Sequence, residues 1–317
     1  MFVIDWDIRI GQYKLGLLDK VNIHTSVDLL SDTAEITLPG TVINKSIDIE
    51  KKIKCGDEVS VSLGYDGELQ TEFKGYLNTI STDKSKVVLK CEDALFLFRK
   101  PLANKEYKNI TLKNFLKAVI AELGLSIKIA CKYDFTYDKF VVNGATAYDI
   151  LKKVQEETKA NIYMKGDALQ VQPQYVETFG EARYNFAQNI ETDNLTYRTT
   201  DDQKFEVEVE GLTKKGESVK VVVGTPGGDK RSVKIYGVTD KAVLKKRGEE
   251  EVKNLSYDGF EGDFTGWLLP TCSAGYVAEL TDDEYPRKNG KYYVTAVTTE
   301  VSSVGGSRKI QLGRKIN

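Results

Sequence analysis

The stretch Glu58-Val-Ser-Val-Ser-Leu-Gly-Tyr-Asp-Gly-Glu-Leu-Gln-Thr-Glu-Phe-Lys-Gly75 decides how the N-terminal part of the chain folds. Val59, Val61 and Leu63 alternate with polar residues, which is the two-residue period of a half-buried β-strand. The residues Gly64 to Gly67 supply turn chemistry, and a second strand-like run follows them. The stretch therefore predicts an antiparallel hairpin.

Further short strands are predicted directly after this hairpin. Tyr76-Leu-Asn-Thr-Ile80 and Lys86-Val-Val-Leu-Lys-Cys91 are both strand-like, and a polar turn separates them. Several short antiparallel strands at this spacing are typical of a small barrel or sandwich. We expect residues 1–100 to form a β-barrel module.

The apolar period then changes from two residues to that of a helix. Apolar residues recur at helical spacing from Leu112 to Leu123, with Thr111 as a candidate N-cap and Gly124 as a candidate stop. A second helix is predicted to begin near Thr146, with Asp149 placed for a capping interaction. A hairpin is predicted over residues 162–172, so residues 101–175 are expected to form an α+β module.

Strands return from about residue 176 to the end of the chain. Phe205, Val207 and Val209 alternate with glutamates, two more strand-like runs flank a Gly-rich turn, and the chain closes with strand-like sequence. One helix is predicted from about Asp240 to Leu255, and Gly248 within it suggests close packing against a neighbouring backbone. The fold class predicted is α+β, mainly β, in which two related β-barrel modules, 1–100 and 176–317, bracket the α+β module.

The bulk composition argues against several classes of function. The 317 residues carry a net charge of −2, so no basic surface for nucleic-acid phosphates is expected. No run approaches the roughly 20 apolar residues of a membrane helix, so membrane insertion is not expected. Met1 to Asp7 includes two acids and lacks the pattern of a signal peptide, which predicts synthesis in the cytoplasm.

The scarcity of histidine and the spacing of cysteine argue against an enzyme or a metal site. His24 is the one histidine and lies in a strand-like stretch, while the four cysteines form no CxxC motif. We therefore predict no catalytic residues, no metal and no cofactor. Gly224 to Ser232 combines glycines with a lysine and a serine, but its spacing is not that of a phosphate-binding loop, and we predict a hairpin loop there.

Two features leave alternatives open. Glu206, Glu208 and Glu210 lie on one strand face, where they could be solvated or line a pore, but neighbours on one face cannot flank a sugar as glycosidase carboxylates do. The 17 tyrosines and 12 phenylalanines are expected mainly in core and interface packing, although they could also build a sugar-binding surface. Glu206, Glu208 and Glu210 are our candidate lumen-facing residues.

Local sequences in all three modules resemble the phage tail baseplate hub family, which includes late-control-D-type proteins and the hub portion of type VI secretion spike proteins. The resemblance rests on Cys55-Gly-Asp-Glu-Val-Ser-Val61, Thr71-Glu-Phe-Lys-Gly-Tyr-Leu77, Asn109 to Leu116, Phe140 to Leu151, Asn161 to Val171 and Thr239 to Leu255, and on the closing stretches 275–280, 285–294 and 305–313. Its motif positions fall on Phe73, Gly75, Tyr285, Pro286, Asn289 and Gly290.

The resemblance implies a structural role without enzymatic activity. In such hubs each subunit contributes two related barrels, so that a homotrimer forms a ring with a six-fold-like outline that joins the tail tube protein to the spike protein. DNA would be a partner only as passing cargo, and the protein would reside in the virion tail baseplate after assembly in the host cytoplasm. The alternative that we retain is a tail-associated carbohydrate-binding module.

Overall fold

The structure is a computed structural model, and it describes residues 3–42, 45–46, 52–82, 85–133, 136–158, 160–201, 203–212, 218–236 and 239–316. Strands dominate, with three α-helices and two short 3-10 helices among these residues. The predicted class, α+β and mainly β, is confirmed. Among the described residues no helix is both long and apolar enough to span a membrane.

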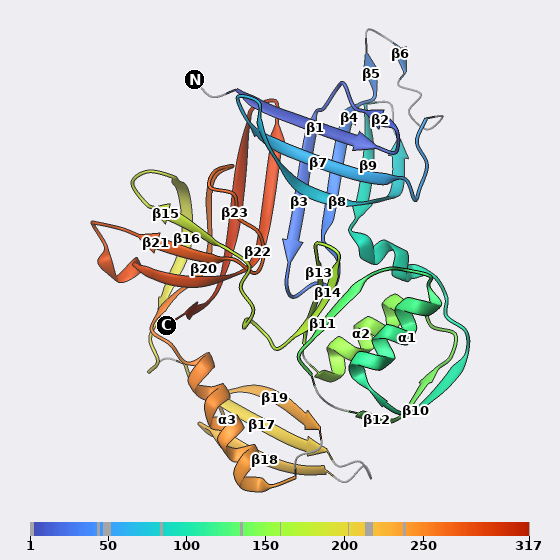
Figure 1. The fold of residues 1–317 in the computed structure, drawn as a ribbon. Helices are drawn as coiled ribbons and strands as arrows, with labels where there is room; N and C mark the ends of the chain where they lie inside the picture. Colours follow the sequence, from blue (N-terminus) through green and yellow to red (C-terminus); the bar gives the residue numbers. More distant parts are fainter. Residues whose placement is uncertain are drawn as a thin grey trace.

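The largest element is one sheet of 13 strands that contains both the first and the last strands of the chain (Figure 1). Its main path runs in the order β16-β20-β23-β22-β3-β4-β9-β8-β7-β1-β2, and β21 and β15 branch from β22. Its N-terminal strands are β1 (Ile4–Ile10), β2 (Tyr13–Lys14), β3 (Lys20–Ser26), β4 (Thr33–Pro39), β7 (Glu58–Tyr65), β8 (Glu68–Thr82) and β9 (Lys86–Glu92). Its C-terminal strands are β15 (Glu181–Asn185), β16 (Ile190–Arg198), β20 (Gly259–Trp267), β21 (Val277–Thr281), β22 (Gly290–Ser302) and β23 (Gly305–Ile316).

This continuity differs from the two separate barrels expected from the sequence. The described strands close no hydrogen-bonded ring, and β3 pairs antiparallel with β22 so that the two β regions share one sheet. The reason is the length of β22, whose first residues pair with β21 and whose later residues, from Ala296 to Ser302, pair with β3. The boundaries 1–100, 101–175 and 176–317 stay a prediction.

The predicted hairpin is present as β7 and β8. Tyr65 pairs with Glu68, so the turn consists of Asp66 and Gly67, which both have positive φ, at 51° and 87°. This is the backbone of the two-residue turn that matches strand twist. β7 therefore runs two residues further than expected, through Gly64 and Tyr65. β1, β7 and β8 curl over one end of β3, β4 and β9 around an apolar core (Figure 1).

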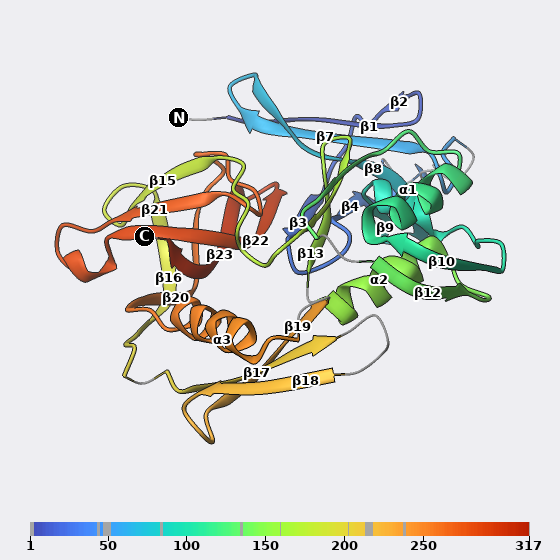
Figure 2. The same ribbon diagram turned by 60° about the horizontal axis from the view of Figure 1, so that its bottom comes forward.

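The helical part packs beside the sheet around its own core (Figures 1 and 2). It comprises η2 (Ala94–Arg99), β10 (Lys105–Thr111), α1 (Leu112–Glu122), β11 (Lys128–Cys131), β12 (Thr136–Val142), α2 (Ala147–Thr158), β13 (Asn161–Lys165) and β14 (Ala168–Gln172). Both predicted helices are confirmed. The Thr111 hydroxyl accepts from the Asn114 amide at 3.3 Å, and Thr146 and Asp149 bond reciprocally at the start of α2.

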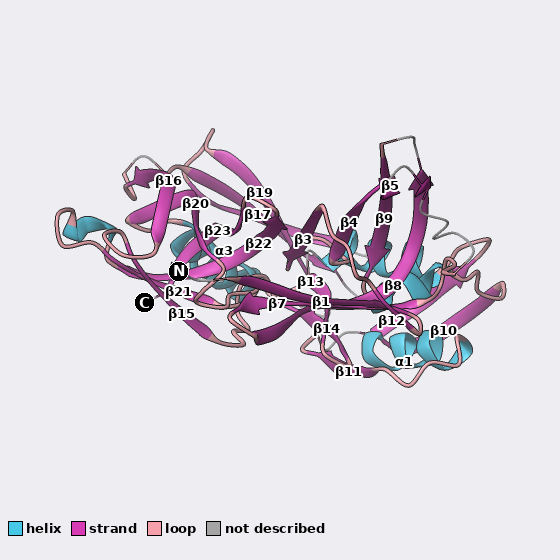
Figure 3. Cartoon of the chain, turned by 90° about the horizontal axis from the view of Figure 1, so that it is seen from above, coloured by secondary structure: helices cyan, strands magenta, loops and turns pink. Residues whose placement is uncertain are grey.

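A third unit, which we call the α3 unit, hangs below the main sheet (Figure 1). It consists of β17 (Phe205–Leu212), β18 (Ser218–Gly224), β19 (Asp229–Tyr236) and α3 (Lys241–Leu255), with its own small core. The predicted helix is confirmed, but these strands form a separate sheet in the order β18-β17-β19. Figure 3 shows the elongated molecule from above, with β16 and β20 at one end and α1, β10 and β12 at the other. A two-stranded piece, β5 (Thr41–Val42) and β6 (Lys45–Ser46), and η3 (Pro286–Lys288) complete the described elements.

Candidate functional site

The pairing of β3 with β22 joins the two ends of the chain, and we call it the seam. Seven residues of each strand pair in register, from Ala296 with Ser26 to Ser302 with Lys20. His24 lies in the seam, where its Nδ1 is 3.0 Å from the Thr298 hydroxyl oxygen, and partial burial lowers its pKa. Leu268 and Val301 from the C-terminal region complete the apolar core of the N-terminal strands. The two regions therefore share one sheet and one apolar core at the seam.

A buried ion pair between Arg308 and Glu72 lies close to the seam. The Arg308 Nη2 atom is 2.8 Å from Glu72 Oε1, and the side chains are 1% and 8% exposed. Arg308 also donates to the Thr299 hydroxyl at 2.8 Å and to the Leu268 carbonyl at 3.1 Å. Burial works against the charge on Arg308, but the hydrogen-bonded Glu72 carboxylate raises the pKa of the guanidinium above its usual value. These contacts hold β23 against Glu72 on β8, against Leu268 after β20 and against Thr299 on the neighbouring β22.

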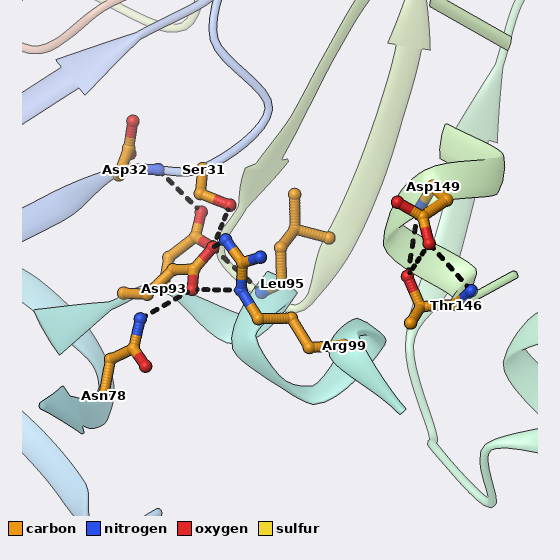
Figure 4. A network of polar contacts seen from close by, with 9 residues as sticks. Ser31, Asp32, Asn78, Asp93, Leu95, Arg99, Thr146 and Asp149 are labelled. Carbon is orange, nitrogen blue, oxygen red and sulfur yellow. Dashed lines mark hydrogen bonds and ion pairs between the residues drawn. The ribbon is translucent and has the colours of Figure 1, made fainter. Parts of the chain in front are cut away.

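A polar network joins the end of the sheet to the helical part, and Figure 4 shows it from close by. The Glu92 carboxylate accepts from Arg99 Nη2 and Nε, both at 2.7 Å, and from the Ser31 hydroxyl at 2.8 Å. Asp93 caps η2 by accepting from the Leu95 amide at 2.9 Å. The network lines a groove of about 880 Å³ over β4 and β9. Because every carboxylate in it has a donor, we interpret it as a structural joint.

Two aspartates of this joint lie close together, the buried Asp93 and the partly buried Asp32. The Asp32 carboxylate accepts from the Ser26 amide at 2.9 Å, and its own amide donates to the Asp93 carboxylate at 3.2 Å. Burial raises the pKa of Asp32 to about 7, although the Ser26 amide and the nearby Lys165 charge oppose the shift. Burial, and then the charge of Asp32, also raise the pKa of Asp93 well above its usual range. Ser26 ends the strand that forms the seam, so the acids lie at its end.

The main path of the large sheet has two open ends, and β15, which pairs with β21 alone among the described strands, ends the branch from β22. β16 is hydrogen-bonded to β20 alone, and β1 carries the two-residue strand β2 on part of its outer edge, among the strands that the structure describes. An open edge exposes unpaired amide and carbonyl groups, which proteins cover by assembly, by charge or by short strands. Tyr197 on β16 and Trp267 on the neighbouring β20 are 39% and 44% exposed, and aromatic side chains of this kind are enriched at interfaces. This end is the candidate assembly surface.

The three glutamates predicted to face a lumen lie together on β17, on the sheet face opposite α3. Val207 and Val209, which alternate with them, are fully buried in the core of the α3 unit. Lys220 lies 2.9 Å from Glu208 and Lys234 lies 3.9 Å from Glu210, while Glu206 accepts from the Gly227 amide. The charges of the glutamates are therefore largely balanced by residues of this sheet. The face that they form is not purely acidic. That they face a lumen stays a prediction.

Two of the family-like motif positions, Phe73 and Gly75, lie together on β8. Phe73 is buried in the core of the N-terminal strands. A Cβ on Gly75 would lie 2.2 Å from the Glu92 carbonyl oxygen and 2.7 Å from the Phe73 ring, so a side chain there would displace the backbone. Both positions are explained by packing beside Glu92.

The other four motif positions form the turn between β21 and β22. Pro286 begins η3, and the Asn289 side-chain oxygen accepts from the Asp282 amide at 2.6 Å. Gly290 has φ of 155°, and a Cβ there would lie 2.7 Å from Lys315 Cε. Tyr285 is 62% exposed. Turn geometry accounts for three of these residues, and Tyr285 is the one that is free to contact a partner.

The charged residues that matter most for the joints were not singled out from the sequence. Arg308 shares a strand face with Ile310 and Leu312, which are buried, so its position in an apolar alternation was a signal of burial. Asp32 and Asp93 carry no such signal because each lies at the end of a strand, where acids are common. Nothing in sequence spacing links Glu72 to Arg308.

The described residues contain no cluster of histidine, cysteine or acidic side chains that could hold a metal ion. All four cysteines are free; Cys91 and Cys272 are buried, which raises their pKa. Most large aromatic side chains lie in apolar cores, as expected, and the few exposed ones include Tyr197, Trp267 and Tyr285. The carbohydrate-binding alternative stays untested.

Comparison with known proteins places the chain among tail-like folds. A family model described as YQBQ-like matches residues 30–238, more than half of the chain. No curated protein sequence matches.

Several solved structures share the fold over nearly the whole chain. The 43 kDa tail protein of prophage MuSo2 from Shewanella oneidensis has a TM-score of 0.66 at 16% identity, covering 98% of this chain and 97% of that one. A tail protein from Neisseria meningitidis has a TM-score of 0.65 at 15% identity, covering 99% and 96%. The E. coli type VI secretion component c3393, described as similar to the phage T4 tail proteins gp27 and gp5, has a TM-score of 0.61 at 10% identity, covering 97% and 76%. The predicted resemblance to tail hub and spike proteins is confirmed for the fold.

Proposed function

The chain belongs to the YQBQ-like family, and from that premise we propose that it is a structural hub protein of a phage tail or a related injection machine. In this proposal it acts by fitting against copies of itself and against neighbouring tail components, without catalysis. Three copies form a ring that joins the tail tube to the spike. Cargo such as DNA passes through the ring, and assembly takes place in the host cytoplasm.

The observation that carries the proposal is the single sheet whose main path has two open ends. One copy uses β22 and β3 to connect its C-terminal strands to its N-terminal strands, which leaves β16 at one end and β1 with β2 at the other. Two different ends on each copy suit head-to-tail contact, and such contacts close into a ring when the rotation between copies permits. The likeness of fold to tail proteins over nearly the whole chain supports the same assignment.

The faces of the ring provide the remaining contacts. Tyr285, which is exposed on the turn before β22, is a candidate anchor for a tube or spike protein. Glu206, Glu208 and Glu210 are candidates for the lumen, where their pairing with lysines gives a polar surface of balanced charge. Such a surface would hold passing cargo weakly, because it offers neither apolar area nor excess charge.

Mass measurement of the purified full chain tests the ring. We expect native mass spectrometry and light scattering across a concentration series to give three times the monomer mass of 35.5 kDa. Lysine at the exposed edge positions Thr192 and Asn194 of β16 should shift the protein to monomer, because charged side chains block edge contacts. The matched control is Val222→Lys on β18, which is 55% exposed and outside the main sheet.

Two results would contradict this assembly. If the natural chain and Val222→Lys were both monomeric at every concentration, the proposed ring would be contradicted. A trimer that the β16 lysines leave intact would move the interface away from this edge. Electron microscopy of the trimer would then show whether a central channel is present.

A further inference from the structure

We propose that the groove along the outer edge of β19 binds an extended acidic segment of a partner protein, which joins the sheet of the α3 unit as a fourth strand. This inference goes beyond the ring and does not depend on it. It concerns a groove lined by the α3 unit and by neighbouring parts of the chain, including Arg198 at the end of β16. Figure 2 shows where β19 lies relative to the main sheet and α2.

The edge of β19 faces the groove. β19 pairs in parallel with β17 along its whole length, and no described strand pairs with its other edge. Seven consecutive residues, Asp229 to Ile235, line the groove. Since successive side chains of a strand point to opposite faces, lining by consecutive residues means that the groove follows the strand edge itself. The backbone amide and carbonyl groups of that edge are thus available to an added strand.

The groove has the size and walls for a chain segment. Its volume is about 1330 Å³, above the roughly 300–1,000 Å³ of pockets that hold drug-sized ligands. Opposite β19 it is lined by Tyr175 from the link after β14 and by Gly313 and Arg314 near the end of β23. Thr158, at the end of α2, also lines it, and α2 lies in contact with β19.

The charged side chains of the groove indicate what kind of partner it would bind. Lys230, Arg231 and Lys234 all project from β19, and the first two make no ion pair with any described residue. Across the groove, Arg314 donates to the Tyr175 carbonyl at 2.9 Å. It forms no ion pair with a carboxylate of the described residues. The groove therefore holds three cations, Lys230, Arg231 and Arg314, that are in no ion pair with a described residue.

Most acidic side chains of the groove already have a partner within the chain. Glu250 lies 3.5 Å from Arg247, and Glu261 pairs with Arg198. Asp28 accepts from the Tyr175 hydroxyl at 3.0 Å. Burial raises the pKa of Glu251, which disfavours its charged form. Asp229, at the start of β19, is the remaining acid, so the balance along the edge favours an anionic partner.

An extended acidic peptide satisfies both features at once. Its backbone would bond to the edge of β19. Its acidic side chains at alternate positions would share one face of the sheet, where they would meet either Lys230 and Lys234 or Arg231. Strand addition of this kind takes its affinity from main-chain hydrogen bonds and its specificity from alternate side chains. A nucleic acid would match the charges but has no backbone amides to pair with a strand edge.

The test uses the full chain with a segment fused after Asn317. Because β23 ends at Ile316 and Arg314 lines the groove, a flexible Gly/Ser linker can deliver the segment at high effective concentration. The probe is eight residues that alternate Val and Glu. We expect hydrogen exchange of the β19 amides to slow by about tenfold or more relative to the unfused chain. In the fused chain, Lys230→Glu with Arg231→Glu should abolish the protection while exchange in α3 stays unchanged.

Two control segments and two further outcomes decide the proposal. A segment alternating Val and Lys, and the Val–Glu segment with proline at alternate Val positions, should both fail to protect β19. Unchanged exchange with the Val–Glu segment would overturn the proposal, as would equal protection by the Val–Lys segment. Protection of β19 by free oligothymidylate would assign the groove to nucleic acid instead. Protection that rises with the concentration of the unfused chain would assign it to a second copy.

Discussion

The seam and the α3 unit show two ways in which strands distant from the N-terminus are attached to this protein. At the seam, β22 enters the same sheet as β3, and a buried Arg308–Glu72 pair fixes the neighbouring strands. The α3 unit has its own sheet and its own small core, and its ion pairs are exposed. We therefore expect the two regions joined at the seam to unfold together and the α3 unit to lose structure without disrupting the main sheet.

Both tryptophans make this comparison measurable. Trp6 lies on β1 and Trp267 lies on β20, both in the main sheet, and the α3 unit contains no tryptophan. Tryptophan fluorescence thus reports on the sheet, and hydrogen exchange of α3 and β17 reports on the α3 unit.

The largest effect is expected from breaking the ion pair beside the seam. Arg308→Met leaves the Glu72 carboxylate buried without its partner, which should lower the free energy of unfolding by about 3–5 kcal/mol. Urea unfolding followed by tryptophan fluorescence measures it. The control is Lys309→Met, whose exposed pair with Asp263 should be worth about 1 kcal/mol or less. Equal stability of the two variants would show that the pair does not hold the seam.

The next effect comes from pH acting on the acids at the end of the seam. Burial raises the pKa of Asp32 to about 7, so the folded state binds a proton that the unfolded state, with a pKa of about 3.9, has released. The resulting stability is fully present below about pH 4 and is lost as the pH rises through about 7. Between pH 5 and 8 the loss should be about 2–3 kcal/mol, and Asp93 acts in the same direction.

The variant that checks this pH dependence is Asp32→Asn. It should flatten the decline in the fluorescence-detected melting temperature between pH 5 and 8. Asp283→Asn, at an exposed aspartate, should leave the decline as it is. A natural chain whose stability rises over this interval would refute the assignment to Asp32.

A smaller effect is expected inside the α3 unit. A Cβ on Gly248 would lie 2.4 Å from Val223 Cγ2 and 2.9 Å from Val209 Cγ2. Gly248→Val should therefore overpack this core and lower the free energy of unfolding of the α3 unit by about 1–3 kcal/mol. Hydrogen exchange in α3 and β17 should accelerate while the tryptophan transition stays in place. Glu249→Val, exposed on the same helix, is the control. A shift of both signals by the same amount would show that the unit and the sheet unfold together.

The smallest effect belongs to the exposed charges of β17. Glu208→Gln removes the 2.9 Å pair with Lys220, and exposed pairs contribute about 0–1 kcal/mol. Glu208→Gln should accelerate hydrogen exchange in β17 less than Gly248→Val does. The difference in exchange between Glu208→Gln and the natural chain should vanish at high salt, because screening weakens exposed pairs. A loss as large as that of Arg308→Met would mean that this row is part of a buried contact.

Local structure followed from the sequence wherever neighbouring residues determine it. The period of two in Val59, Val61 and Leu63 identified β7, and the Thr146–Asp149 spacing identified the start of α2, because both patterns depend on residues a few positions apart. Gly248 was also recognised as a packing position, although the atoms that it meets are the Val209 and Val223 side chains, not backbone.

The arrangement of these pieces was decided by tertiary structure. Alternation shows which face of a strand is buried but not which strand pairs with which, so β22 could be recognised as a strand while its pairing with β3 could not. The same limit hid the partnership of Glu72 with Arg308 and the separate sheet of the α3 unit. Sequence therefore determined the elements and their buried faces, and long-range hydrogen bonding and burial, which no local pattern records, decided that two β regions became one sheet.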